Sequence, residues 1–146
     1  MVETLFSFCN TAILGCWFCL IVLPRKAITQ QLIRYPYVPL VLSVFYLYFL
    51  SESPPLSEAD FSSLSGILAL FLQATPASAA AGWVHYLGFD FWMGAWMVQD
   101  QQQRGQHPLW VLPALLCTFM LGPTGVLIYT LILGLQKLTA TTDANG

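Results

Sequence analysis

Two ionisable side chains, Asp90 and His85, stand inside an apolar segment at residues 79–98. An ionisable residue at membrane depth is costly, and its presence indicates a function. Burial favours the neutral form of a carboxyl group, so Asp90 is a candidate general acid. The alternative is a purely structural role, in which Asp90 makes a hydrogen bond to Asn10 or to a backbone carbonyl and fixes helix packing.

The spacing of His85 and Asp90 places them on different faces of a helix. Five residues correspond to about 140° around the axis at 3.6 residues per turn. Both can therefore act on one ligand only if that ligand touches two sides of the helix. His85 is a candidate catalytic base, and it also fits a packing residue or a pigment ligand. The residues that share its face are aromatic: Phe89, Trp92 and Trp96. The residues that share the face of Asp90 are Gly82, Tyr86 and Gly94.

Three further polar positions have simpler interpretations. Asp100 ends the segment, and Arg104 follows at the spacing of a helical ion pair, which predicts a structural role for both. His107 before Pro108 indicates a helix start rather than a ligand. Asn10 lies deep in the first apolar segment and is a candidate ligand-binding residue.

The residues that are missing narrow the chemistry. Two histidines cannot supply the histidine clusters of a membrane di-iron oxygenase, and neither GxxxxGK[ST] nor GxGxxG occurs. We therefore expect no metal and no cofactor. A net charge of −2 with only five basic residues argues against nucleic acid as a partner. Cys16 and Cys19 form a CxxC inside an apolar run, where cysteine behaves as a small hydrophobe.

The composition predicts an all-α integral membrane protein. The chain is 57% hydrophobic and 8% charged, against about a quarter charged in ordinary globular domains. Lipid accepts such a surface, and the apolar runs lack the alternation of barrel strands. We expect one four-helix transmembrane domain over residues 1–138 and a polar tail over 139–146. The expected spans are residues 5–23, 37–50, 79–98 and 109–135.

Two local patterns refine this topology. Ser57 and Asp60 resemble a capping box, which predicts a short interfacial helix before the third span. The fourth segment is interrupted by Gly122, Pro123 and Gly125, and the proline predicts a kinked helix there.

The loop charges predict an orientation. The first loop carries Arg25, Lys26 and Arg34, whereas the second carries only acids. Basic loops face the cytoplasm or stroma, so four spans put both termini on the opposite side.

The sequence resembles the abscisic-acid-deficient-four-like family over nearly its whole length. The resemblance is strongest in a Trp-x-His-x-x-x-x-Asp string that runs from Trp83 to Asp90. The other matching positions are Asn10 and residues 37–40, 64–67, 94–96, 100 and 122–125.

Plant members of this family are plastid membrane proteins needed to convert violaxanthin to neoxanthin. The resemblance implies a four-helix membrane fold and a role in carotenoid metabolism. The implied reaction opens an epoxide to an allenic alcohol, with Asp90 as the acid and His85 as the base. The N-terminus does not read as a transit peptide, so we expect either a bacterial or cyanobacterial member in a plasma or thylakoid membrane, or a plastid-membrane member whose presequence has been removed. The substrate stays open.

Two functions remain open at this stage. The first is a cofactor-free carotenoid isomerase, and the second is a non-catalytic pigment- or lipid-binding subunit that partners with a photosynthetic complex or another carotenoid enzyme. A third interpretation is that the chain is half of a transporter, but no internal repeat in the sequence supports it. We expect a gap beside the third segment, filled by an elongated apolar ligand such as a carotenoid, by membrane lipid, or by another copy in a homo-oligomer. The residues expected to line it are Trp83, Tyr86, Phe89 and Trp92.

Overall fold

The computed structural model describes residues 1–144, together with their side chains except those of Glu58 and residues 139–144. The prediction of an all-α protein is confirmed, since every regular element among these residues is helical. The predicted tail begins inside the last helix, which continues to Ala144.

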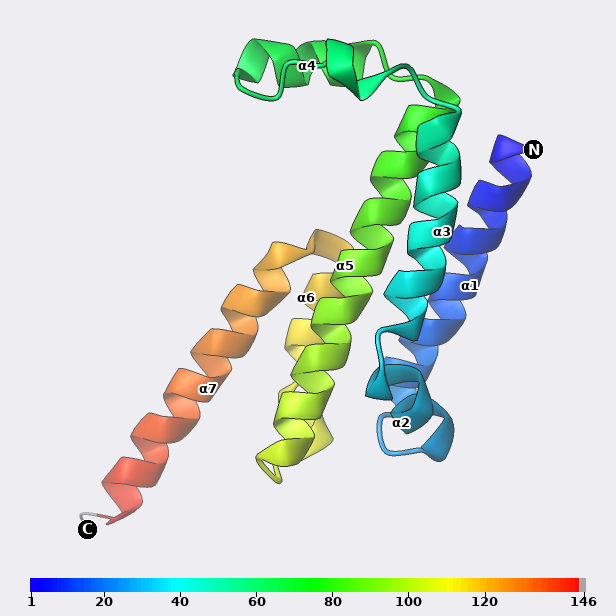
Figure 1. Ribbon diagram of the computed structural model, residues 1–146. Helices are drawn as coiled ribbons and strands as arrows, with labels where there is room; N and C mark the ends of the chain where they lie inside the picture. Colours follow the sequence, from blue (N-terminus) through cyan, green and yellow to red (C-terminus); the bar gives the residue numbers. More distant parts are fainter. Residues whose placement is uncertain (145–146) are drawn as a thin grey trace.

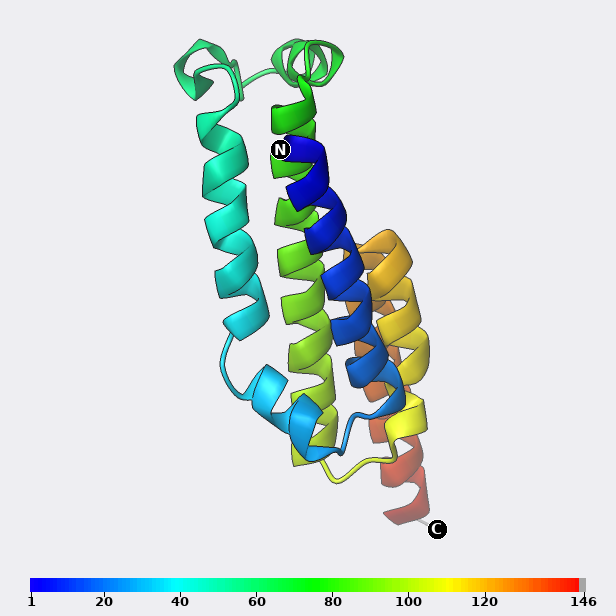
Figure 2. The ribbon, with the colours of Figure 1, turned by 90° about the vertical axis from the view of Figure 1, so that its right-hand side faces the viewer.

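Three long helices form the centre of the molecule. Helix α5 (Pro76–Gln103) lies between α1 (Val2–Val22) and α3 (Tyr37–Ser51) on one side and the α6–α7 pair on the other (Figures 1 and 2). Contact between α1 and α5 depends on Gly94, because a Cβ there would lie 2.8 Å from the Trp17 ring. The edge of Trp17 also packs against Phe91 and Phe119.

Two short helices lie across the ends of this bundle. Helix α2 (Ala27–Arg34) meets α3 at 55°, and α4 (Leu64–Leu72) meets α5 at 117°. Figure 1 shows α4 lying across one end. A short helix thus precedes α5 as expected, and its place at a membrane interface stays a prediction.

The predicted capping box at Ser57 and Asp60 is wrong. Residues 56–58 form only a 3₁₀ turn, and α4 begins at Leu64 with Ser63 as its cap. The Ser63 hydroxyl accepts a hydrogen bond from the backbone N–H of Gly66. The carboxylate of Asp60 instead accepts hydrogen bonds within its own turn.

The fourth segment is not one kinked helix, which corrects the predicted kink, and the four predicted crossings are not confirmed. It consists of a 3₁₀ turn (Pro108–Trp110), α6 (Leu112–Leu121) and α7 (Pro123–Ala144), with α7 folded back along α6 (Figure 1). Gly122 reverses the chain with φ 54° and ψ −110°, a conformation that only glycine adopts easily. Gly125 then lets the two helices touch, because a Cβ there would lie 1.8 Å from the Thr118 hydroxyl.

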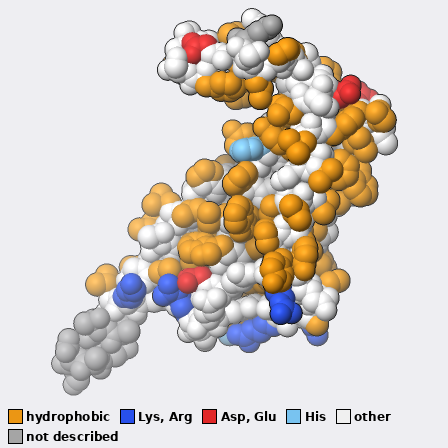
Figure 3. All heavy atoms as spheres, viewed as in Figure 1, with side chains coloured by type: hydrophobic (Ala, Val, Ile, Leu, Met, Phe, Trp, Pro, Cys, Tyr) orange, Lys and Arg blue, Asp and Glu red, His pale blue; other side chains and the backbone are white. Residues whose placement is uncertain are grey.

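This reversal also corrects the prediction that both termini lie at one end. The N-terminus lies near α4, whereas α7 ends at the opposite end of the bundle, where α2 lies (Figure 1). Arg25 and Lys26 are in the turn before α2, and lysine and arginine side chains gather at this end (Figure 3). Glu52 and Asp60 lie in the connection to α4, at the other end.

Among the described helices, α1 by itself has the length and apolar character needed to cross a membrane. The number rises to three if the bent α2–α3 and α4–α5 pairs each count as one crossing.

Candidate functional site

Asp90 lies in the middle of α5 and faces the turn between α6 and α7. A Cβ on Gly122 would be 3.1 Å from Oδ1 and 3.5 Å from Oδ2 of Asp90. The carboxyl group is partly buried, and no described group makes a hydrogen bond or ion pair with it. The first turn of α7 begins directly after Gly122, so the Asp90 carboxyl lies beside a helix N-terminus.

His85 is an exposed side chain held only by aromatic rings. Its ring centroid lies 4.7 Å from that of Phe89, 5.8 Å from Tyr46 and 6.2 Å from Tyr86. It therefore leans toward α3, whereas Asp90 faces the α6–α7 turn, in keeping with their spacing in the sequence. No described group makes a hydrogen bond with the imidazole.

Asn10 makes its hydrogen bond with Trp83 and not with Asp90. Its Oδ1 accepts a hydrogen bond from Nε1 of Trp83 at 3.0 Å, which joins α1 to α5. Among the described contacts there is none between Asn10 and Asp90, so a hydrogen bond between them does not account for the carboxyl group. Trp83 is thereby oriented toward α1.

A hollow of about 450 Å³ separates α5 from α7. We call it the α5–α7 hollow, and its lining residues are Phe89, Trp92, Met93, Trp96 and Val126. Asp90 is adjacent to Phe89 in the chain and lies one helical turn from Met93. Val126 is likewise one turn along α7 from Gly122. Asp90 itself is not a lining residue, but the hollow is built from its neighbours on α5 and from α7 one turn beyond Gly122.

The walls of this hollow are aromatic and continue up to His85. The rings of Phe89 and Trp92 are 6.0 Å apart, and Trp96 packs edge-on against Tyr129 at 5.7 Å. Phe89 is 56% exposed and Trp92 is 49% exposed, so neither ring is a core residue. Apolar side chains cover most of this face of the molecule (Figure 3).

The five predicted ligand-binding residues are thus brought together only in part. Phe89 and Trp92 line the hollow, and Tyr86 is 58% exposed beside His85. Asn10 and Trp83 face each other at the α1 side. The sequence reasoning missed Met93 and Val126, and no local signal marks Val126, because its place depends on the chain reversal at Gly122.

Asp100 is tied to its neighbours, unlike Asp90. Its carboxylate accepts hydrogen bonds from Nε and Nη2 of Arg104 at 2.7 and 3.1 Å, which is the ion pair expected from their spacing. The hydroxyl of Tyr129, a buried residue of α7, also donates to it at 2.7 Å. The carboxylate raises the pKa of the Arg104 guanidinium through these bonds. Asp100 therefore serves to hold α7 against α5.

The described residues contain no group of three or more histidine, cysteine, aspartate or glutamate side chains that could hold a metal ion. The four cysteines are free thiols.

A family model described as ABA DEFICIENT 4-like matches residues 4–129. The chain belongs to this family. The matched region includes His85, Asp90, the α5–α7 hollow and the turn at Gly122. No curated protein and no solved structure matched the chain.

Proposed function

We propose that this family member is an integral membrane protein of carotenoid metabolism that isomerises a cyclic epoxide end group to an allenic alcohol. The proposal is supported by the family membership and by the chemistry of the groups around the α5–α7 hollow. The observation that carries it is the Asp90 carboxyl, which has no described partner and faces Gly122, while its chain neighbour Phe89 lines an aromatic, open hollow.

In this proposal α1, the bent α2–α3 pair and α5 cross the membrane, and the α6–α7 pair enters it and turns back. The 28 residues of α5 extend about 42 Å, beyond a hydrocarbon core of about 30 Å. The 10 residues of α6 extend about 15 Å, which reaches the middle. The basic end, with Arg25 and Lys26, faces the cytoplasm or stroma.

This arrangement makes a simple labelling prediction. A tag at the N-terminus and a tag after residue 146 are reached by an impermeant reagent from opposite sides of the membrane. Labelling of both tags from the same side would contradict the re-entrant α6–α7 pair and restore four crossings.

Asp90 acts as the general acid of the reaction. Its proton passes to the epoxide oxygen, and the carbon–oxygen bond at the ring carbon attached to the polyene breaks. The Asp90 carboxylate that remains is stabilised by the N-terminus of α7, because the N–H groups of a first helical turn favour a nearby negative charge.

His85 acts as the base. It removes a proton from the polyene carbon next to that ring carbon, and the electron pair of the C–H bond completes the allene. The substrate has then gained one proton at oxygen and lost one at carbon, so the reaction is an isomerisation. Along the helix axis the Cα atoms of His85 and Asp90 are about 7.5 Å apart, and Phe89, whose ring contacts His85, lies between them.

Purified protein in lipid nanodiscs, supplied with a 5,6-epoxy carotenoid, tests the proposal. The expected result is an allenic isomer of unchanged mass, identified by chromatography and mass spectrometry. Asp90→Asn should abolish it, and His85→Phe, which keeps the ring packing against Phe89 and Tyr46, should abolish it as well. No product from the folded wild-type protein would contradict the proposal.

The second candidate is a non-catalytic subunit that binds pigment or lipid beside a photosynthetic complex or another carotenoid enzyme. The exposed aromatic rings between His85 and Trp96 favour it, because they stack on a polyene without any chemistry. A deletion strain separates the two candidates. Loss of one xanthophyll with accumulation of its precursor supports the enzyme, and an unchanged pigment profile supports the subunit.

A further inference from the structure

Three cations surround helix α2, which lies across the basic end of the bundle. Arg25 and Lys26 directly precede the helix, Arg34 is its last residue, and all three are exposed. Lys26 and Arg34 are separated by about 12 Å along the helix axis. Charges in water are screened over about 8–10 Å at ordinary salt concentrations, so the fields of the three cations overlap. We call these three residues the α2 surface.

The charges of the α2 surface have no described counter-ion. Among the described side chains, none of the three cations forms an ion pair. Nη2 of Arg25 donates to the backbone carbonyl of Gln106 at 3.5 Å, a contact that leaves the charge uncompensated. The carboxylate of Asp100 lies at the same end, but it is bonded to Arg104 and Tyr129. Within the described part of the chain, the α2 surface therefore keeps its positive field.

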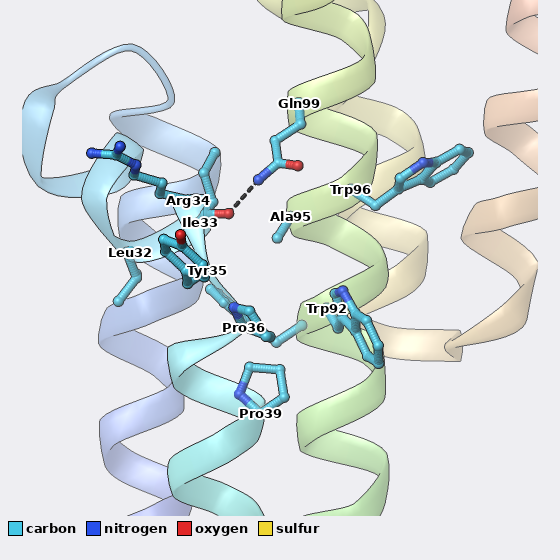
Figure 4. A pocket seen from close by; sticks show the side chains of 11 residues that line it. Leu32, Ile33, Arg34, Tyr35, Pro36, Pro39, Trp92, Ala95, Trp96 and Gln99 are labelled. Carbon is cyan, nitrogen blue, oxygen red and sulfur yellow. Dashed lines mark hydrogen bonds between the residues drawn. The ribbon is translucent and has the colours of Figure 1, made fainter.

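The other face of α2 is tied to the bundle by neutral groups. Thr29 and Ile33 are buried, and the Thr29 hydroxyl donates to the carbonyl of Leu23 at 2.7 Å. Figure 4 looks into a pocket of about 140 Å³ between the α2–α3 connection and α5. There Nε2 of Gln99 donates to the carbonyl of Ile33, whereas the guanidinium of Arg34 is turned away from α5 (Figure 4). Helix α2 therefore directs its cations outward from a fixed position.

The α2 surface lies directly between two apolar helices. Arg25 comes three residues after the end of α1, and Arg34 comes three residues before the start of α3. In the membrane arrangement proposed above, both positions fall at the level of the lipid headgroups. Ile28, Tyr35 and Tyr37 are exposed beside the cations. Exposed tyrosine together with lysine and arginine is typical of a membrane interface, so these surroundings favour lipid over a soluble acidic partner.

We propose that the α2 surface binds the headgroups of anionic phospholipids in the leaflet at the basic end. Arg25, Lys26 and Arg34 form ion pairs with lipid phosphates, and the exposed Ile28 contacts the acyl chains below them. This inference rests on the membrane arrangement given under the proposed function, and it is independent of the isomerase chemistry.

Spin-labelled lipids test the α2 surface with the full-length protein in phosphatidylcholine vesicles. The two probes are phosphatidylglycerol and phosphatidylcholine, each present as a trace and labelled on the acyl chain near the glycerol. The fraction of each probe that the protein immobilises gives its relative association constant. The wild-type protein should prefer the phosphatidylglycerol probe by about 5-fold or more. The preference should fall as the salt concentration rises, because salt screens exposed charges.

Three variants separate the charges of this surface from those nearby. The triple variant Arg25→Gln, Lys26→Gln, Arg34→Gln should reduce the preference to about 2-fold or less. The double variant Arg25→Lys, Arg34→Lys keeps the charge and should keep the preference. The matched control is Asp100→Asn with Arg104→Gln, which removes an ion pair from the same end without changing the net charge. It should keep the preference as well.

Equal association of the two probes with the wild-type protein would overturn the α2 surface as a lipid site. So would a preference that survives in the triple glutamine variant, because it would belong to other residues. Binding of an acidic protein without any lipid preference would assign the surface to that protein. The proposed function fails separately, since the vesicles contain no carotenoid. Absence of the allenic product would refute the isomerase and leave the lipid preference intact.

Discussion

Two carboxyl groups on the same helix have opposite surroundings. Asp100 accepts hydrogen bonds from Arg104 and from the Tyr129 hydroxyl. Its negative charge is therefore partnered, and the bond to Tyr129 holds α5 and α7 together. Asp90, ten residues earlier on α5, has no described partner and lies against Gly122, next in the chain to Phe89 of the α5–α7 hollow. A partnered carboxylate at a helix end is explained by stability, whereas an unpartnered one inside an apolar segment calls for a function.

The two ends of α5 differ in the same way. Near Asp100 the loops are tied by side chains that donate to backbone carbonyls: Gln102 and Gln30 to Pro24, Arg25 to Gln106, and Thr29 to Leu23. Around His85 the described contacts are between rings. The hydrogen bonds between loops therefore lie at the basic end, whereas Asp90 and His85 make none with the described groups.

Exchanging each carboxyl for an amide gives the largest expected contrast. Asp90→Asn should lower the rate of isomerisation by about 100-fold or more, because a general acid contributes at least that much, with little change in melting temperature. Asp100→Asn should keep most of the activity and lower the free energy of unfolding by about 1–2 kcal/mol. Turnover and thermal unfolding in nanodiscs measure both. Full activity of folded Asp90→Asn would remove Asp90 as the acid.

A methyl group at Gly122 tests whether the turn positions Asp90. Gly122→Ala meets both an unfavourable φ of 54° and the Asp90 Oδ1, and should cost about 2–3 kcal/mol of stability and most of the activity. Gly105→Ala is the matched control, since its φ is 64° but nothing lies within 4 Å of the added carbon. It should cost about 1–2 kcal/mol and spare the activity. Equal losses of activity in the two variants would show that backbone strain alone is responsible.

Tyr129→Phe removes one hydrogen bond, the one that the Tyr129 hydroxyl donates to the Asp100 carboxylate. The ring keeps its edge-on contact with Trp96, so the expected loss is about 1 kcal/mol, read as a lower melting temperature. The rate of isomerisation should stay near that of the wild-type protein. A large fall in the rate would instead connect Asp100 and Tyr129 to the reaction.

Pro123→Ala should have a smaller effect. The proline occupies the first position of α7, where its missing N–H costs nothing, and Gly122 makes the turn. Stability should fall by less than about 1 kcal/mol, through the greater freedom of the unfolded chain, and the α6–α7 pair should stay folded back. The separation of spin labels on α5 and α7 measures this. If the separation of the labels increased to the value expected for α6 and α7 as one continuous helix, the result would contradict the turn.

Asp60 is a third carboxylate, partnered but exposed, and it provides a pH test. Hydrogen bonds from the side chains of Ser62 and Ser63, and from the backbone of Ser62, lower its pKa to about 2. Because the pKa in the folded state lies below the ordinary value, these bonds stabilise the turn above about pH 4 and are lost as the pH falls toward 2. Amide exchange at Gly66 should speed up over that interval. Asp60→Asn should show no such change with pH.

The helices themselves were predictable from local patterns. The apolar run predicted over residues 5–23, ended by Pro24, falls on α1 (Val2–Val22), and Tyr37–Ser51 starts and stops close to the predicted residues. The Asp100–Arg104 pair and the divergence of His85 from Asp90 follow from 3.6 residues per turn, because both concern one helix.

What the sequence could not decide is the direction of the chain after Leu121. Gly-Pro-Thr-Gly permits either a kink in a continuing helix or a complete reversal, and local hydropathy is the same for both. The reversal depends on Gly122 adopting a positive φ beside Asp90 and on Gly125 packing against Thr118, which are contacts between distant residues. From it follow the place of Val126 in the hollow, the bond from Tyr129 to Asp100, and the end of α7 on the basic side. The residues that can do chemistry are thus set by the sequence, whereas the cavity that gives them a substrate exists only once α7 has folded back along α6.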